Sequence, residues 1–206
     1  MIEKGMEDDF LPEFYAEKIP DEVFRRMRGK SFREGCPVSR EELRYLKISH
    51  FGFDGMPRTG EMVAAGRIAD DLLEIFQKLF QARYPIERIR LIDDYGGSDA
   101  ASMRDNNTSC FHFRTISGSK KLSKHSLGLA VDVNPLYNPY VKTAGDRVVT
   151  EPPEARAYAD RSAEFPHKIT EEDLCCRLFC RYGFEWGGAW KAVRDYQHFE
   201  KKIPEP

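Results

Sequence analysis

The apolar residues between Glu61 and Arg83 recur at intervals of three and four, which is the period of a helix with one buried face. The positions are Ile68, Leu72, Ile75, Phe76, Leu79 and Phe80. Tyr84 and Pro85 end the pattern, because proline restricts the residue before it and lacks the backbone N–H that a helix needs. The spacing therefore predicts a long helix within residues 61–83.

Two shorter segments also have the pattern of a helix. Residues 171–182 are amphipathic and are followed by Gly183, a residue that can take the left-handed conformation found at many helix ends. Residues 21–28 follow Pro20, and Asp21 is of a type that caps helix N-termini. We expect helices in both segments, with Asp21 as the N-cap of the earlier one.

Two segments show strand signals before the middle of the chain. Residues 42–50 have a mixed strand pattern, and residues 88–95 are short, partly β-branched and closed by Gly96 and Gly97. We expect a strand in each, the second of them ending in a turn.

A third strand is indicated at residues 129–133, where apolar and other positions alternate. The alternation places Asp132 on the polar face of this strand beside the small Ala130. Residues 117–123 are small and basic and predict a loop before it. Residues 135–153 are rich in Pro, Asn, Gly and Tyr, and predict a long loop or a hairpin after it.

Composition limits the classes of protein to which the chain can belong. It has 206 residues, 41% of them hydrophobic, and no apolar run approaches the ~20 residues of a membrane-spanning helix. The 32 Lys and Arg residues are balanced by 34 Asp and Glu residues, so there is no overall basic field to attract nucleic acid. We expect a globular monomer with no nucleic-acid partner and no transmembrane segment.

The first forty residues differ from the rest in being charged and interrupted by proline and glycine. We expect residues 1–40 to form an N-terminal extension that packs on a single domain of residues 41–206. The chain begins with acidic residues where a secretory signal would have a basic and then an apolar region. No signal peptide is therefore expected in this sequence.

Four residues are of the types found in the zinc site of a hydrolase: three candidate ligands and one candidate general base. His125, Asp132 and His198 would supply the three nitrogen and oxygen ligands that catalytic zinc commonly has. His125 and Asp132 can converge only if the backbone bends between them, and Gly128 allows that bend. Asp195 lies three residues before His198, a spacing that can hold a general base beside the metal.

Spacing alone leaves other interpretations open. A hairpin at Gly128 with Asp132 capping a turn would account for the first segment without any metal. A cysteine nucleophile paired with histidine is a second hydrolase interpretation, and Cys110 near His112 is the candidate for it. It would need an exposed thiol with a lowered pKa.

Two motifs follow each other along the chain: Ser123-x-His125-x-x-Gly128-x-Ala130-x-Asp132, and some sixty residues later Trp186-Gly-Gly-x-Trp190 with Asp195-x-x-His198-Phe199-Glu200. Together, in this order, they resemble the M15 family of zinc D-alanyl-D-alanine carboxypeptidases, dipeptidases and L-alanyl-D-glutamate endopeptidases. The resemblance extends over roughly residues 43–200. It implies that His125, Asp132 and His198 bind Zn²⁺ and that Asp195 activates water. Many relatives have Glu in place of Asp195, so the shorter side chain must lie closer to the water or act through a second water molecule.

The family also has an arginine upstream of the first zinc ligand that polarises the scissile carbonyl. Arg114 is our choice for this role, and Arg104 is the competing candidate. His112 stands where many relatives have Asn, and we give it no metal role.

Ser123 has two interpretations of equal weight. Its hydroxyl can hold the substrate or orient the site, or it can cap a turn. Trp186 and Trp190 are expected to pack in the interior, with a wall of the substrate cleft as the alternative.

The resemblance implies an α+β fold: a small, mostly antiparallel sheet with helices packed on one side and the zinc site on the open face. The elements predicted above agree with it. The implied function is zinc-dependent hydrolysis of bacterial peptidoglycan stem peptides, with D,D-carboxypeptidase activity preferred. L-alanyl-D-glutamate endopeptidase activity and a non-catalytic zinc-binding cell-wall module are the alternatives. Such substrates are extracytoplasmic, so we expect the protein in the periplasm or cell wall.

Overall fold

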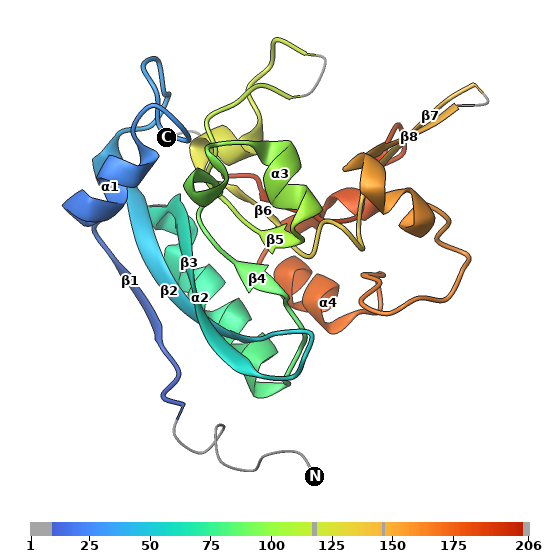
Figure 1. Cartoon of the computed structure of the whole chain (residues 1–206), viewed down its shortest axis with the longest axis horizontal. Helices are drawn as coiled ribbons and strands as arrows, with labels where there is room; N and C mark the ends of the chain where they lie inside the picture. The colour runs from blue at the N-terminus through green and yellow to red at the C-terminus, as the bar shows by residue number, and fades with distance from the viewer. Residues whose placement is uncertain (1–9, 117–118, 146, 204–206) are drawn as a thin grey trace.

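The long helix predicted from the apolar spacing packs on a three-stranded antiparallel sheet (Figure 1). The structure is a computed structural model and describes residues 10–116, 119–145 and 147–203. The strands occur in the order β1-β2-β3. The four elements are β1 (Phe14–Glu17), β2 (Leu43–Phe51), β3 (Pro57–Ala65) and α2 (Gly66–Gln81).

Helix α2 begins later than its sequence pattern suggested. Residues 61–65 belong to β3, which pairs with β2 along its whole length. Pairing with a distant strand therefore overrides the local pattern, and the helix starts at Gly66. The strand predicted at residues 42–50 is confirmed by β2.

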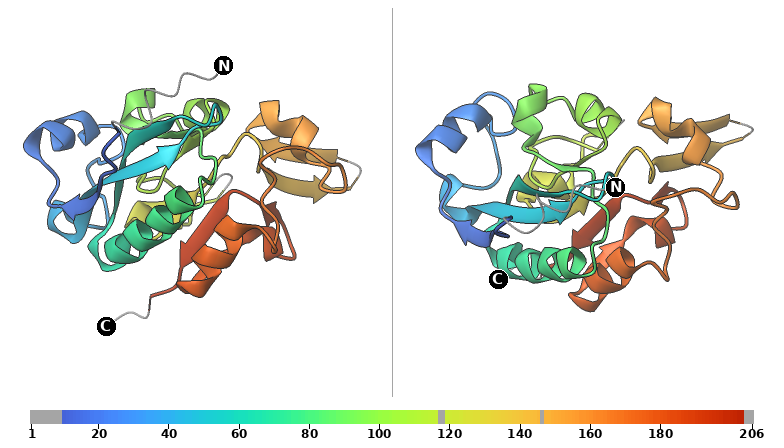
Figure 2. Two further views of the ribbon diagram at one scale, coloured as in Figure 1. Left: turned by 90° about the horizontal axis from the view of Figure 1, so that it is seen from below. Right: turned by 60° about the horizontal axis from the view of Figure 1, so that its bottom comes forward.

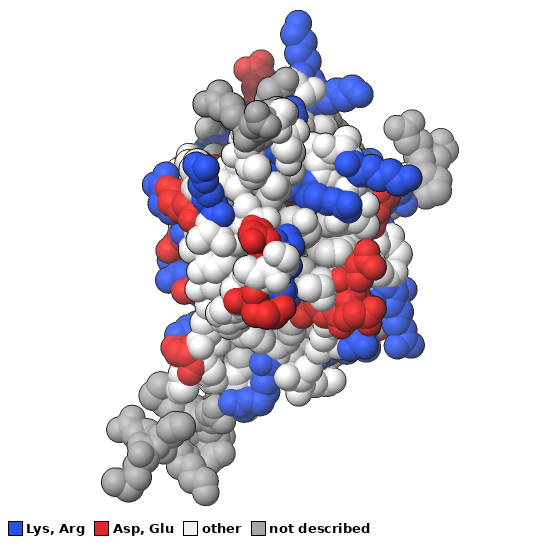
Figure 3. All heavy atoms as spheres, turned by 90° about the vertical axis from the view of Figure 1, so that its right-hand side faces the viewer, with Lys and Arg blue, Asp and Glu red and all other residues white. Residues whose placement is uncertain are grey.

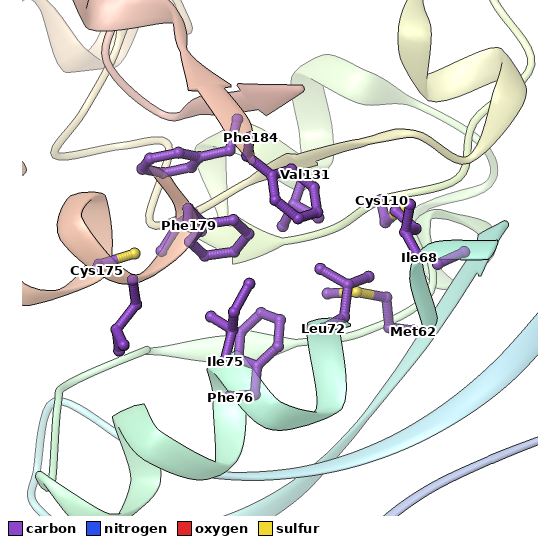
Figure 4. Close-up of a cluster of buried hydrophobic side chains, with 14 of the residues drawn as sticks. Met62, Ile68, Leu72, Ile75, Phe76, Cys110, Val131, Cys175, Phe179 and Phe184 are labelled. Carbon is purple, nitrogen blue, oxygen red and sulfur yellow. The ribbon is translucent and has the colours of Figure 1, made fainter. Parts of the chain in front are cut away.

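The main hydrophobic core lies between α2, its sheet and the C-terminal half of the chain (Figure 4). Phe179 joins the two halves: its ring meets Phe76 edge-on at 6.1 Å and stacks on Phe199 at 4.4 Å. Phe199 directly follows His198, so the core fixes the strand that carries this histidine. Other buried members of the cluster are Met62, Ile68, Leu72, Ile75, Cys110, Val131, Cys175 and Phe184.

The two shorter predicted helices are both present. Gly183 has a φ of 81° just after the second of them, as the sequence suggested. The N-cap of the first is Pro20 and not Asp21, which is the first helical residue. The Asp21 carboxylate instead accepts a hydrogen bond from Arg40 at 2.7 Å, so it does not cap the backbone. The helices are α1 (Asp21–Met27) and α4 (Leu174–Arg181).

A second antiparallel sheet has the order β6-β11-β9 and carries two of the predicted metal ligands. The strand predicted at residues 129–133 is confirmed by β6, the strand that begins this sheet. Its register places Asp132 directly opposite His198. The strands are β6 (Ala130–Asp132), β9 (Phe184–Trp186) and β11 (His198–Lys201).

The segment expected to be a loop or a hairpin contains a hairpin that projects at one end of the molecule, opposite α1 (Figure 2). A short third strand, which carries Asp195, pairs with the first strand of the hairpin. These strands are β7 (Tyr140–Ala144), β8 (Arg147–Glu151) and β10 (Arg194–Asp195).

The strand predicted at residues 88–95 is shorter than expected. It ends at Ile89, because the N–H of Arg90 donates to the side chain of Asn107, at 2.8 Å, instead of to a backbone carbonyl. A 3₁₀ turn then replaces the rest of the strand. The remaining elements are β4 (Arg88–Ile89), β5 (Asn107–Thr108), α3 (Asp99–Arg104), and the 3₁₀ helices η1 (Arg40–Glu42), η2 (Ile92–Tyr95), η3 (Lys124–Leu127), η4 (Pro153–Tyr158) and η5 (Gly187–Ala189).

The α+β class with mostly antiparallel pairing is confirmed, with the strands divided among small sheets; β4 and β5 form a parallel pair. Strand β1, from the segment expected to be an extension, is hydrogen-bonded to β2. Residues 1–9, which hold the acidic start, and residues 117–118 of the predicted basic loop lie outside the described part. Within that part, no helix is long and apolar enough to cross a bilayer. The face beside the hairpin carries basic and acidic side chains intermixed (Figure 3).

Candidate metal centre and active site

A tight turn places His125 in the interior. The Ser123 hydroxyl accepts the N–H of His125 at 3.3 Å and so caps η3, and Gly128 ends the turn with a φ of 65°. Gly128 also lies against β3: its carbonyl accepts the N–H of Ala65 at 2.9 Å, and a Cβ on Gly128 would lie 2.6 Å from that nitrogen. The bend expected at this glycine is therefore present, and only glycine fits there without displacement.

The three side chains expected to bind metal converge. Nδ1 of His198 lies 3.0 Å from Oδ1 of Asp132, and Nε2 of His125 lies 3.1 Å from Oδ2 of the same carboxylate. The two imidazole nitrogens, Nε2 of His125 and Nδ1 of His198, are 3.3 Å apart. All three residues are buried, with exposed fractions of 3% to 6%. The structure thus brings together the set that the two distant motifs suggested.

The outer nitrogen of each imidazole also has a partner. Nδ1 of His125 lies 2.6 Å from the carbonyl oxygen of Cys110, and Nε2 of His198 lies 3.3 Å from Oε2 of Glu200. Because a carbonyl only accepts, Nδ1 of His125 is the protonated nitrogen and Nε2 has a free lone pair. Such outer partners fix the tautomer and the orientation of histidine ligands.

The ionisation of the centre suits a cation. Burial would raise the pKa of Asp132, but His125 and His198 hold it well below its usual range. Burial would lower the pKa of His198, yet its bonds to Asp132 and Glu200 raise it to about 10. The cluster therefore keeps a carboxylate ionised and attracts positive charge, which a divalent metal can supply in place of a proton. Two imidazoles and a carboxylate form a donor set that fits catalytic zinc.

Asp195 lies beside the centre on a different sheet. Strand β10 places it opposite Tyr140, and its Oδ1 is buried with no hydrogen-bond partner among the described residues. Burial raises the pKa of Asp195 to about 7, against the attraction of His198. Gly187 allows Asp195 and His198 to lie close to η5. A Cβ on this glycine would lie 2.9 Å from the Cβ of Asp195 and 3.3 Å from the Cβ of His198.

The two candidate arginines have different surroundings. Arg104 extends to the surface, where its Nε donates to Glu154 at 2.7 Å and 60% of its side chain is exposed. Arg114 is more buried, its Nη2 lies 3.0 Å from Oδ2 of Asp99, and its charge acts on Asp195. The geometry therefore favours Arg114 as the cation of the site.

The tryptophans lie mainly in the packed interior. Trp186 is buried and donates its Nε1 hydrogen to the carbonyl of Tyr196 at 2.9 Å. Trp190 is partly buried: it donates to Glu185 at 2.8 Å, and its ring centroid lies 5.4 Å from that of His198. Both thus support β9, η5 and the ligand strand β11.

The cysteine interpretation finds no support in the structure. Cys110 is buried, and burial raises its pKa far above that of a reactive thiol. Its Sγ donates to the carbonyl of Gly128 at 3.5 Å. Cys110 therefore acts through packing and through the backbone carbonyl that orients His125.

Sequence reasoning missed three contributions. Glu200 was visible in the HisPheGlu motif, and its position two residues after His198 on a strand places both side chains on one face. Asp99 lies in the polar stretch after η2 and carries no local signal. The contact of the Cys110 carbonyl comes from the backbone, so no residue type could reveal it.

Residues from both sequence motifs meet at this site. A family model matches the segment of the chain that contains both motifs. Residues 117–201 match the model described as D-alanyl-D-alanine carboxypeptidase, of the M15 peptidases. This match supports an M15 family peptidase. No curated protein and no solved structure gives a significant match.

The M15 match includes His125, Asp132, Asp195 and His198, so sequence similarity and spatial convergence select the same residues. Arg114 lies upstream of the matched segment, and its assignment rests on its surroundings.

Proposed function

We propose that this M15 peptidase is a zinc-dependent D-alanyl-D-alanine carboxypeptidase that acts on peptidoglycan stem peptides. The observation that carries the proposal is the convergence of His125, Asp132 and His198 beside Oδ1 of Asp195, which has no hydrogen-bond partner in the part of the chain that the structure describes. A metal-binding module needs the first three groups only. An aspartate beside them whose Oδ1 is buried, with no hydrogen-bond partner among the described residues, favours an enzyme.

Bound zinc would be held by His125, Asp132 and His198, and would supply Lewis acidity toward the carbonyl and toward water. Asp195 takes the proton of the attacking water and later returns it to the leaving amine, because a carboxyl whose pKa is about 7 can do both near neutral pH. Arg114 donates hydrogen bonds to the carbonyl oxygen as negative charge develops there. The outer contacts of His125 and His198 keep both rings aligned.

The test uses purified full-length protein, its zinc content measured by mass spectrometry of the metal. Zinc-loaded and chelated protein are then incubated with a defined stem pentapeptide ending in D-alanyl-D-alanine. We expect only the zinc-loaded protein to release the terminal D-alanine, and chelated protein to recover activity when zinc is returned. Absence of cleavage by fully loaded protein would reject the proposed function.

Mass spectra of the peptide products of this assay separate the alternatives. Cleavage after the first L-alanine of the stem would identify an L-alanyl-D-glutamate endopeptidase. Stoichiometric zinc without any cleavage would identify a non-catalytic cell-wall module. Because the proposed substrate is part of the cell wall, we also propose an extracytoplasmic location, which fractionation of cells expressing the protein would test.

A further inference from the structure

We propose that Asp99 is a positioning residue whose carboxylate holds the guanidinium of Arg114 at the edge of the metal centre. The inference deepens the proposed function and rests on it, because it concerns how that site places its cation. Asp99 is the first residue of α3, an element to which the sequence assigned no role.

The contacts place one carboxylate between two groups of the segment before η3. Oδ2 of Asp99 lies 3.0 Å from Nη2 of Arg114, and Oδ1 lies 3.7 Å from Nδ1 of His112. His112 is buried, and its Nδ1 has no closer hydrogen-bond partner in the described residues. Asp99 is thus the acidic group that faces both Arg114 and His112.

The backbone beneath Arg114 is already fixed to the turn that carries His125. The N–H of Arg114 donates to Oγ of Ser126 at 2.9 Å, and its carbonyl accepts the N–H of Ser123 at 3.0 Å. The N–H of His112 donates to the carbonyl of His125 at 3.1 Å. What these bonds leave undefined is the far end of the long arginine side chain, which loses much rotamer freedom when it is held.

Asp99 holds the guanidinium of Arg114 without using all the N–H donors of that group. The carboxylate contacts Nη2, while Nε of Arg114 is buried with no partner among the described residues. Nη1 has a long contact of 3.5 Å to the carbonyl of Thr115. Because Nη1 has only this long contact and Nη2 carries a second N–H, the guanidinium keeps N–H groups for an oxygen of the substrate.

The pair lies close enough to the centre to act on it. Burial would raise the pKa of Asp99, but His112 and Arg114 lower it, so the carboxylate is ionised when it holds the guanidinium. The charges of Asp132 and His125 also affect the pKa of Asp99, and the charge of Arg114 lowers the pKa of Asp195. A cation misplaced by about 1 Å at such a position can cost about 100-fold in rate.

The test compares Asp99→Asn, Arg114→Ala and the double variant in the zinc-loaded full-length protein. Asp99→Asn keeps the shape of the side chain but removes its charge. We expect kcat on the stem pentapeptide to fall by about 10-fold to 100-fold, with KM, zinc content and unfolding temperature near those of the parent. If Asp99 acts through Arg114, the double variant is no slower than Arg114→Ala alone.

Glu154→Gln is the matched control, because Glu154 pairs with the exposed Arg104 in the same way. We expect that variant to keep parental kcat. Full kcat in Asp99→Asn, or losses that multiply in the double variant, would overturn the inference.

A second measurement does not depend on catalysis. In ¹⁵N spectra of zinc-loaded protein, the Arg114 guanidinium should show slowed rotation and a shifted Nε–H resonance, both lost in Asp99→Asn and kept in Glu154→Gln. Unchanged Arg114 resonances in Asp99→Asn would also overturn the inference. If the parent cleaves no stem peptide, the proposed function fails, and these spectra alone still decide whether Asp99 holds Arg114.

Discussion

Gly128 joins the turn of His125 to β3, and replacing it by alanine tests whether that contact positions the site. Its φ of 65° is unfavourable for alanine, which costs about 1–2 kcal/mol. A new Cβ would also lie 2.6 Å from the nitrogen of Ala65 and 3.2 Å from Cδ2 of Leu43, both in the packed interior. Overpacking of this kind adds about 1–3 kcal/mol. We therefore expect Gly128→Ala to lose about 2–5 kcal/mol of unfolding free energy.

Gly55→Ala separates the two terms. Gly55 has a φ of 76°, and no atom lies within 4 Å of the position that a Cβ would take. Gly55→Ala therefore has the cost of the unfavourable φ alone, without overpacking. Urea unfolding should show about 1–2 kcal/mol of loss for Gly55→Ala and clearly more for Gly128→Ala. Zinc content should fall only in Gly128→Ala, because the turn carries His125. Equal losses in the two variants, with zinc kept in both, would refute the argument that close packing against β3 fixes this turn.

The remaining predictions concern metal binding, catalysis and acid stability. Asp195→Ala should keep stoichiometric zinc and lose hydrolysis, whereas His198→Ala should lose zinc; an active Asp195→Ala enzyme would exclude it as the base. Glu200→Gln should weaken zinc binding by about 10-fold to 100-fold in competition with a chromogenic chelator, while Glu185→Gln, which removes a carboxylate bonded to Trp190, should not. Burial lowers the pKa of His50 to about 4, so the folded protein keeps it neutral while the unfolded chain takes up a proton near pH 6.5. The contribution of His50 to the free energy of unfolding should therefore be full above pH 6.5 and fall by up to about 3 kcal/mol toward pH 4. Urea unfolding at several pH values should show a weaker pH dependence for His50→Gln than for the parent.

The sequence was most informative where local pattern and tertiary packing agree. The apolar stripe of α2 identified its buried face, and two short motifs identified Asp132 and His198 although 65 residues separate them. It failed where a distant partner decides the outcome. Residues 61–65 form a strand because β2 lies beside them, and the strand from Arg88 ends at Ile89 because the side chain of Asn107 takes the next N–H.

The same distinction applies to the site. Metal ligands must be particular residue types at particular positions, so they leave a motif in the sequence. The group beside a candidate ligand or cation can be a backbone carbonyl, such as that of Cys110 beside His125, or an acid distant in the sequence, such as Asp99 beside Arg114. Only their proximity in space reveals such groups.

Asp195 and the metal ligands are anchored to separate parts of the molecule. Asp132 and His198 face each other within one pair of strands, whereas Asp195 lies on β10, which pairs with strand β7 of the projecting hairpin and places Asp195 opposite Tyr140. A displacement of this hairpin would therefore move Asp195 relative to Asp132 and His198. The distance between the proposed base and the proposed ligands thus depends on how the two sheets are placed against each other, and not on either sheet alone.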